Sequence, residues 1–369
     1  MRFKLTGLLL RSRLVPMPIK ARLAARAPLN PGGVSAFMLQ APSRIGRHVA
    51  KGVLVLNQVD QVLQLHPELK ALFLLVERKG WHGPNTSVAA DIKLVEDSST
   101  LPLIRSCFPR AVLIEASGGD FVDEQAFRPL DVSPDFDVIQ IACWSPRKRI
   151  ELMIDAAARL PNVRFVHFGH FEHGGSADEQ AYRQDCLDRA RRQAPNIHFP
   201  YPDPQGDSPP PHDKTSINAW INRARIGLLT THLEGHPRFK MECLAADRPM
   251  LIPTDTSVPT RKHVTAETGR LFDPTATALA EAIPAMLDTL GTFAPRDYVL
   301  AHSGRTNTLR ELRAALASLA GRGVPAKHYD TVDWDGRNQN LRWGDSAMTL
   351  LAELLSTYRP LLPARHRRG

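Results

Sequence analysis

The sequence predicts an α/β protein of two domains, each built on a parallel β-sheet covered by helices, followed by a helical C-terminal tail. The 369 residues exceed the roughly 250–300 that one hydrophobic core normally serves. Short apolar runs alternate with segments of helical periodicity, the order typical of parallel sheets with both faces buried. No stretch approaches the about 20 apolar residues that a membrane-spanning helix needs.

The first expected domain covers residues 1–133. Its start is weakly patterned, because the candidate first strand alternates only loosely and is followed by a Pro/Gly loop. The expected strands lie at residues 3–10, 52–56, 70–76, 91–95 and 111–115, and the expected helices at 58–66 and 99–107. Ser98 or Ser99 is the expected N-cap of the second helix. A polar segment with two prolines, residues 128–137, marks the domain boundary.

The second expected domain covers residues 134–300. Its strands are expected at residues 137–142, 163–168, 197–199, 226–229 and 250–252, and its helices at 146–160, 178–193, 216–223, 237–246 and 277–290. Residues 269–274 read as a loop. The tail, residues 301–369, is expected to be helical with an irregular break at 321–344, and part of it to pack back on the first domain.

The positive charge is concentrated at the two ends of the chain. The net charge is +9, no acidic residue precedes Asp60, and the last six residues read Ala-Arg-His-Arg-Arg-Gly. A basic end of this kind predicts an anionic partner, such as a membrane surface or a lipid-linked or phosphorylated acceptor. The alternative is an ordinary solvated basic face. Nucleic acid is not the expected partner.

The four cysteines have neither metal-ligand nor redox spacing, which is typical of a reduced cytosolic chain with buried thiols. The apolar run Leu8–Leu10 is too short for a signal peptide, and Arg11 follows it directly. The Arg-rich, acid-free start also resembles a transit peptide. We expect a cytoplasmic protein, with the inner face of the membrane as a contact surface.

One stretch, Ile226 to Pro253, has the order strand, loop, helix, turn and strand. Pro237 stands where a first helical residue would be, a position that suits proline. Glu234 and Glu242 place two carboxylates beside this helix N-terminus, where backbone N–H groups bind anions. The stretch therefore predicts a site for an anionic, hydroxyl-rich ligand. The alternative is an ordinary surface pair between Arg238 and Glu242.

A second basic feature follows the strand at residues 137–142. Ser145 and Pro146 are the expected N-cap and first residue of a helix, so that Arg147, Lys148 and Arg149 fall in its first turn. Cations there oppose the helix dipole, and a bound phosphate would remove the conflict. The alternative is a solvated basic turn in which Arg149 pairs with an acid elsewhere.

The histidines do not form a metal pattern. His82 lies in a turn after a strand and is a candidate for the interdomain cleft, although a loop histidine without function is the alternative. His232 and His236 flank the loop at Gly235 without a paired carboxylate, so we predict no metal site. The sequence has no Gly-x-Gly-x-x-Gly after a strand, which counts against a nicotinamide dehydrogenase. It also has no P-loop motif, which counts against a P-loop NTPase.

Two segments resemble the retaining, nucleotide-sugar-dependent glycosyltransferases of family four, which have the GT-B fold. Residues 139–156 are similar to that family's strand, basic loop and helix, and residues 234–249 match its Glu-Gly-x-Pro…Glu-Ala-x-Ala-x-x-x-Pro segment. The resemblance implies two Rossmann-like domains facing each other across a cleft. It covers roughly residues 90–290, with weaker matches at 268–274, 90–98, 118–120 and 127–129.

The resemblance also implies residue roles. The implied catalytic residues are Lys148, Glu234 and His82, and the implied donor-binding residues are Arg147, Lys148, Arg149, Glu234, Gly235, His236, Pro237, Arg238, Phe239 and Glu242. Lys148 would contact the phosphates, Glu242 the ribose and Glu234 the transferred sugar, while the backbone of residues 235–239 would meet the pyrophosphate.

The sequence departs from the family pattern at three places. Cys143 stands near the place of the arginine in Gly-Arg-Leu, Arg149 replaces a glycine, and residues 257–262 replace a Gly-Gly loop. The resemblance implies a hexosyltransferase that moves a sugar from a nucleotide diphosphate sugar to a glycan, lipid-linked or small-molecule acceptor, with no cofactor and no metal. The alternative is a non-catalytic, basic membrane- or polyanion-binding protein on a degenerate GT-B scaffold.

Overall fold

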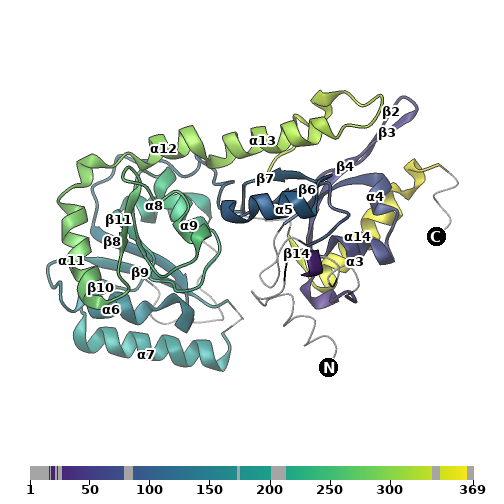
Figure 1. Cartoon of the computed structure of the whole chain (residues 1–369). Helices are drawn as coiled ribbons and strands as arrows, with labels where there is room; N and C mark the ends of the chain where they lie inside the picture. The colour runs from purple at the N-terminus through teal and green to yellow at the C-terminus, as the bar shows by residue number, and fades with distance from the viewer. Residues whose placement is uncertain are drawn as a thin grey trace. The chain divides into compact units, whose positions relative to one another are not determined.

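The computed structural model describes residues 16, 18–20, 23, 27–78, 86–172, 175–200, 213–334 and 341–363. The expected strand at residues 3–10, most of the basic start and the last six residues lie outside these ranges. Two compact units are present, residues 1–117 with 308–369 and residues 118–307. Both units are drawn in Figure 1. Residues 118–133, which were expected in the first domain, group with the second unit.

The sheet of the first unit has the order β14-β1-β4-β5-β6-β7. Its strands are β1 (Ser35–Gln40), β4 (Gly52–Leu56), β5 (Phe73–Glu77), β6 (Ile92–Leu94), β7 (Val112–Ile114) and β14 (Arg342–Trp343). Strands β4 to β7 are parallel, as expected, whereas β1 runs antiparallel to both β4 and β14. The sequence did not predict β1 or β14, because their pairing depends on residues far apart in the chain.

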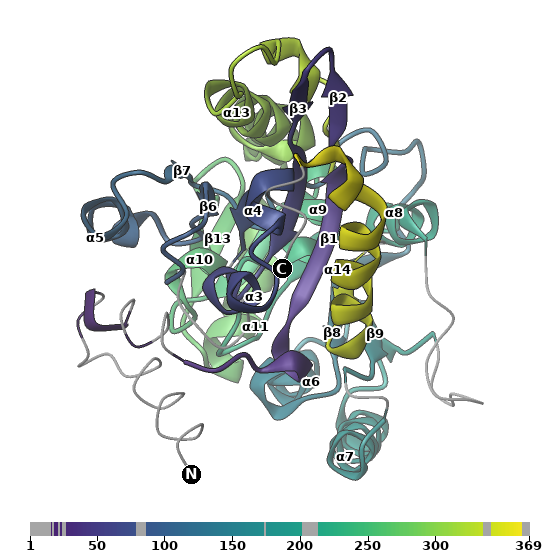
Figure 2. The same cartoon turned by 90° about the vertical axis from the view of Figure 1, so that its right-hand side faces the viewer.

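The helices of the first unit are short, apart from those of the tail. They are η1 (Pro31–Gly33), α3 (Val59–Leu65), α4 (Leu69–Leu72), η2 (Ser98–Thr100), α5 (Leu101–Cys107), η5 (Ala326–Tyr329), α14 (Asp345–Tyr358) and η6 (Arg359–Leu361), with a hairpin of β2 (Ser43–Ile45) and β3 (His48–Ala50). Helix α14 lies beside β1 (Figure 2) and adds Leu351 and Leu355 to the core of the first unit. The residues before α5 are capped by Asp97, whose carboxylate accepts from the Ser99 N–H, so the serine caps predicted there are wrong.

The sheet of the second unit is fully parallel, with the order β10-β9-β8-β11-β12-β13. Its strands are β8 (Phe136–Cys143), β9 (Phe165–His170), β10 (Ile197–His198), β11 (Ala224–Leu228), β12 (Met250–Pro253) and β13 (Gly269–Phe272). Strand β13 replaces the loop expected at 269–274, because it pairs with β12 at the sheet edge. The chain moves outward from β8 to β10 and then returns to β11, which makes β8 and β11 the topological switch point. Open α/β sheets bind ligands at this point, beyond the carboxyl ends of the strands.

Helices cover both faces of this second sheet. They are α6 (Ile150–Ala157), α7 (Ala177–Gln193), α8 (Lys214–Asn222), α9 (Arg238–Ala245), α10 (Val258–Arg261), α11 (Ala276–Leu287), η4 (Leu290–Thr292) and α12 (Pro295–His302), followed by α13 (Gly304–Ser318), which continues into the first unit. Residues of α6, α7 and α11 share one core cluster, and residues of α8, α9 and α12 share another. Within the described residues, no helix combines the length and the apolar character required to cross a bilayer.

His167 is a buried histidine in β9. Its ring packs edge-on against Trp144 and Phe199, with ring centroids 5.0 and 5.8 Å away. Neither ring nitrogen has a hydrogen-bond partner among the described residues. Burial therefore lowers the pKa of His167 to about 3, so that the imidazole is neutral at pH 7.

Replacing His167 with leucine is expected to make folding stability less sensitive to acid. In the parent, the unfolded chain binds a proton below its pKa of about 6.5, whereas folded His167 does not until about pH 3. This group therefore costs stability progressively as the pH falls from 6.5, about 2 kcal/mol by pH 5. Urea unfolding at pH 7 and pH 5 should show a smaller loss for His167→Leu.

The matched control is His302→Leu, which removes an exposed histidine of α12. It should leave the difference in unfolding free energy between pH 7 and pH 5 close to that of the parent. An unchanged pH dependence in His167→Leu would contradict the assignment of a neutral, buried imidazole.

Candidate functional site

The loops after β8 and β11 meet at the switch point of the second sheet. The His232 N–H donates to the carbonyl oxygen of Arg147 (2.9 Å), and the Thr230 hydroxyl donates to that of Lys148 (2.5 Å). In return, the Arg149 Nε–H donates to the carbonyl oxygen of Thr230 (2.6 Å). These reciprocal bonds hold the two loops in one arrangement.

The sequence predicted that the basic loop forms the first turn of α6, and this prediction is wrong. Pro146 to Lys148 form a separate 3-10 turn, Arg149 has a left-handed backbone (φ 48°), and α6 begins at Ile150. Ser145 precedes the 3-10 turn, but its side chain makes no capping hydrogen bond. The basic side chains therefore lie before the helix rather than on its first turn, and the conflict with the dipole of α6 is smaller than expected.

Lys148 and Arg147 both contact the carboxylate of Glu234, which follows β11. The Lys148 ammonium forms an ion pair with it, and the Arg147 guanidinium lies 3.8 Å away. Arg147 also pairs with Glu172 (2.5 Å), and its guanidinium lies 3.7 Å from the Cys143 sulfur. Burial raises the pKa of the Cys143 thiol to about 11, so this side chain is uncharged at pH 7. Arg147 therefore supplies the positive charge near the position where the family pattern has an arginine. Two cations thus converge on Glu234, whose side chain is 9% exposed.

Arg149 has a different partner. Its guanidinium makes two hydrogen bonds to Asp255, at 2.8 and 2.9 Å, in the fork geometry that favours arginine. These hydrogen bonds lower the pKa of Asp255. The alternative considered for Arg149, an acid elsewhere in the chain, is therefore correct, and this residue braces the loops of the second sheet.

The residues after Glu234 lead into α9, which begins at Arg238. Pro237 is the N-cap of α9, although it was predicted to be the first residue of the helix. The Thr260 hydroxyl donates to the carbonyl oxygen of Gly235 (2.8 Å), and that of Ser257 to the carbonyl oxygen of Glu234 (2.5 Å). The loop is thus supported from α10 while it presents the N-terminus of α9.

Apart from Arg149, which pairs with Asp255, the predicted donor residues divide into three groups. Lys148, Arg147 and Glu234 come together directly. Gly235 to Arg238 form the loop and the start of α9, where the side chain of Phe239 is buried in the core, so that only its backbone remains for a ligand. Glu242 lies on the next turn of α9 and is 7% exposed. His82 lies outside the described residues.

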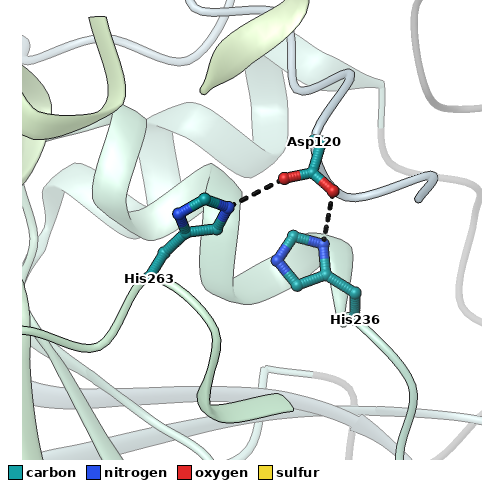
Figure 3. Close-up of side chains that lie close together, drawn as sticks. All are labelled: Asp120, His236 and His263. Carbon is teal, nitrogen blue, oxygen red and sulfur yellow. Dashed lines mark hydrogen bonds and ion pairs between the residues drawn. The ribbon is translucent and has the colours of Figure 1, made fainter. Parts of the chain in front are cut away.

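The side chain of His236 has an environment that the sequence did not predict. It is fully buried, and its Nδ1 lies 3.5 Å from Asp120 (Figure 3). Asp120 also accepts a hydrogen bond from His263 (2.8 Å) and lies 3.3 Å from the Lys262 ammonium. In the sequence, the only signal for Asp120 was the weak family match at residues 118–120. Lys262 was marked only as the end of the segment that replaces the family's Gly-Gly loop, and nothing marked His263.

Asp120, His236 and His263 have the ligand types of a divalent-metal site, and their ligand atoms lie within 4.8 Å of one another. The surrounding charges oppose this use. The ammonium of Lys262 already neutralises the carboxylate. Lys240 lies buried nearby, and burial lowers its pKa to about 7, so it adds a partial positive charge at neutral pH. A divalent cation would therefore create a large excess of buried positive charge. We assign no metal to this cluster.

Burial and the neighbouring charges also determine the protonation states of Asp120, His236 and His263. Burial alone would raise the pKa of Asp120, but the hydrogen bond from His263 and the ammonium of Lys262 hold it well below its usual range. Burial lowers the pKa of His236 well below its usual range, and that of His263 falls for the same reason. At neutral pH the cluster is an ionised carboxylate with a lysine counter-charge and two neutral imidazoles.

Comparison with solved structures identifies the architecture. Sucrose-phosphate synthase from Thermosynechococcus elongatus superposes with a TM-score of 0.54 at 16% identity, over 71% of each chain. The Anabaena protein HepE in complex with UDP gives 0.54 at 16% identity, over 70% of this chain and 76% of that one. A glycosyltransferase from Rickettsia africae gives 0.51 at 13% identity, over 66% and 70%. The chain has the GT-B fold.

The GT-B fold was predicted from the resemblance and is confirmed by these structures. No family model matches the sequence, and no curated protein matches it either. At identities this low the likeness identifies the fold alone. The candidate site of this GT-B chain therefore depends on its own residues at the switch point.

Replacing Glu234 with glutamine is expected to strengthen the binding of inorganic pyrophosphate. Lys148 and Arg147 are both engaged by the Glu234 carboxylate, so an incoming anion must compete with it. Removing this negative charge frees the cations. We expect the loss of this ion pair to raise the affinity for pyrophosphate by about 3- to 10-fold. Isothermal titration calorimetry with pyrophosphate measures the difference.

The control is Glu281→Gln, which makes the same change of charge at an exposed position on α11. It should bind pyrophosphate like the parent. Weaker binding by Glu234→Gln than by the parent would show that Glu234 does not compete with anions for Lys148.

Proposed function

We propose that this protein is a glycosyltransferase that moves a hexosyl group from a nucleotide diphosphate sugar to an acceptor with retention. The observation that carries the proposal is the junction of Lys148, Arg147 and Glu234 at the switch point of the second sheet of a GT-B fold. Neighbouring structures are consistent with it, since HepE was solved with UDP and with UDP-glucose.

In this proposal the diphosphate lies between the basic loop and the N-terminus of α9. Lys148 and Arg147 supply positive charge, and the first N–H groups of α9 supply hydrogen-bond donors. Together they stabilise the negative charge that develops on the leaving diphosphate, which is where such groups lower a barrier most. Once displaced from Lys148, Glu234 is free to accept hydrogen bonds from the transferred sugar, and Glu242 is assigned to the ribose. Catalysis then needs no metal or other cofactor.

We propose that the acceptor binds to the first unit, as the family resemblance implies. We propose an anionic or lipid-linked acceptor, met by a cytoplasmic protein at the inner face of the membrane, because the start of the sequence is strongly basic. Most of this basic segment lies outside the described residues, as does His82, the predicted catalytic residue of the first unit. A membrane contact is thus supported by composition alone.

One observation favours a second function, binding without catalysis. Each of the three basic side chains after β8 already has an acidic partner in the chain, namely Glu172, Glu234 or Asp255. A degenerate scaffold that binds a membrane or polyanion through other surfaces would have this property. Such a protein would bind no nucleotide at the switch point.

A thermal-shift screen with UDP, GDP and their sugars separates the two functions. A transferase should be stabilised by at least one nucleotide, because a ligand that binds only the folded state raises its stability. No shift with any nucleotide at millimolar concentration would favour the binding protein.

Lys148→Ala is expected to reduce the release of nucleotide diphosphate from the active donor by 100-fold or more, the order of magnitude for losing one charge-stabilising group. Its thermal midpoint should change far less, because the removed group belongs to a loop rather than to the core. The control is Lys214→Ala, which removes the lysine of another ion pair of the second unit, with Asp123 at 2.8 Å. Equal rates in Lys148→Ala and Lys214→Ala would overturn the role of Lys148.

A further inference from the structure

The side chain of Asp120 joins three segments of the second unit. Its carboxylate accepts from His263 and Lys262, which follow α10, and from the Ser303 hydroxyl at the end of α12 (3.2 Å). The third segment is the loop before α9, represented by His236. Asp120 is only 4% exposed, so these contacts form inside the protein rather than at its surface.

The backbone beside Asp120 is shaped to the ring of His236. A Cβ atom at Gly119 would lie 2.4 Å from His236 Nδ1 and 3.0 Å from the His236 carbonyl oxygen. Distances of this kind are shorter than van der Waals contact, so no side chain fits at Gly119 while His236 keeps its place. A Cβ atom added at the preceding Gly118 would have no neighbouring atom within 4 Å. The restriction is therefore specific to Gly119.

The loop that contains His236 is supported from both sides. From α10, hydroxyls of Ser257 and Thr260 hold the carbonyl groups of Glu234 and Gly235. The buried ammonium of Lys240 in turn donates to the carbonyl oxygen of Thr260 (2.9 Å). From the opposite side the loop meets Asp120 and Gly119 through His236. Without this second support, the residues between Glu234 and α9 would be free to move.

We propose that His236 is a positioning residue, whose contact with Asp120 and Gly119 fixes the loop before α9 in the shape that binds the donor diphosphate. The inference rests on the proposed function, because it assigns the diphosphate to this loop. The side chain of His236 does not touch the ligand. It acts by reducing the conformational freedom that the loop must lose when the ligand binds, and preorganisation of this kind raises affinity without adding a contact.

Two pairs of variants test the proposal. Gly119→Ala displaces the His236 ring, whereas Gly118→Ala adds the same methyl group in open space. His236→Leu removes the imidazole nitrogen that lies 3.5 Å from Asp120, whereas His236→Asn keeps a polar side chain with a nitrogen close to the place of Nδ1. Calorimetry with UDP and GDP should show about tenfold weaker binding for Gly119→Ala and His236→Leu, the effect of about 1.4 kcal/mol of added ordering cost. Gly118→Ala and His236→Asn should stay within about threefold of the parent.

Hydrogen exchange of residues 234–242 provides a second readout that does not require a ligand. His236→Leu should exchange faster than the parent in this segment, and His236→Asn should remain protected. If the parent binds no nucleotide, the proposed function fails, and the exchange data still decide whether His236 positions the loop.

Unchanged exchange in His236→Leu would overturn the positioning role, as would unchanged nucleotide affinity in a protein that binds nucleotide. If Gly119→Ala fails to fold, the His236→Leu and His236→Asn pair decides the question alone. A uniform rise in exchange over the whole second unit, equal in both His236 variants, would indicate a purely structural histidine and would also overturn the proposal.

Discussion

The ion pair between Lys148 and Glu234 is the interaction on which the candidate site depends. It joins the loop after β8 to the loop after β11, the two strands between which the parallel sheet changes direction. The His232 backbone N–H and the Thr230 hydroxyl hold the same two loops together, so the pair forms without a large entropic cost. Each loop is a short segment of the sequence, and the order of the strands brings the two loops into contact.

The charge balance of this region explains how a basic loop remains stable without a ligand. Arg149 and Asp255 form a fixed brace, whereas Arg147 and Lys148 share the Glu234 carboxylate. An anion bound by Lys148 and Arg147 would replace the Glu234 carboxylate as the partner of these two cations. In the proposed function a diphosphate takes this place, and Glu234 then turns to the transferred sugar.

The sequence predicted the buried parallel strands well, because runs such as Gly52–Leu56 and Met250–Pro253 are apolar on both faces. It did not predict β1 and β14, whose antiparallel pairing joins residues near both ends of the chain. The basic loop was located correctly, but its 3-10 turn and the left-handed Arg149 depend on the bonds to Thr230 and Asp255. The local sequence does not predict such contacts with distant residues.

The environment of His236 illustrates the same limit at the level of the site. Its position in the loop follows from the family match, yet its burial depends on Asp120 and Gly119, which come from the segment before β8. This segment groups with the second unit, although the sequence analysis assigned it to the first domain. Residues 118–120 therefore complete the support of the α9 loop, and the second unit needs them for more than a connection between domains. A chain cut at residue 134 would retain Lys148 and Glu234 but would lose the carboxylate and the glycine that hold His236 in place.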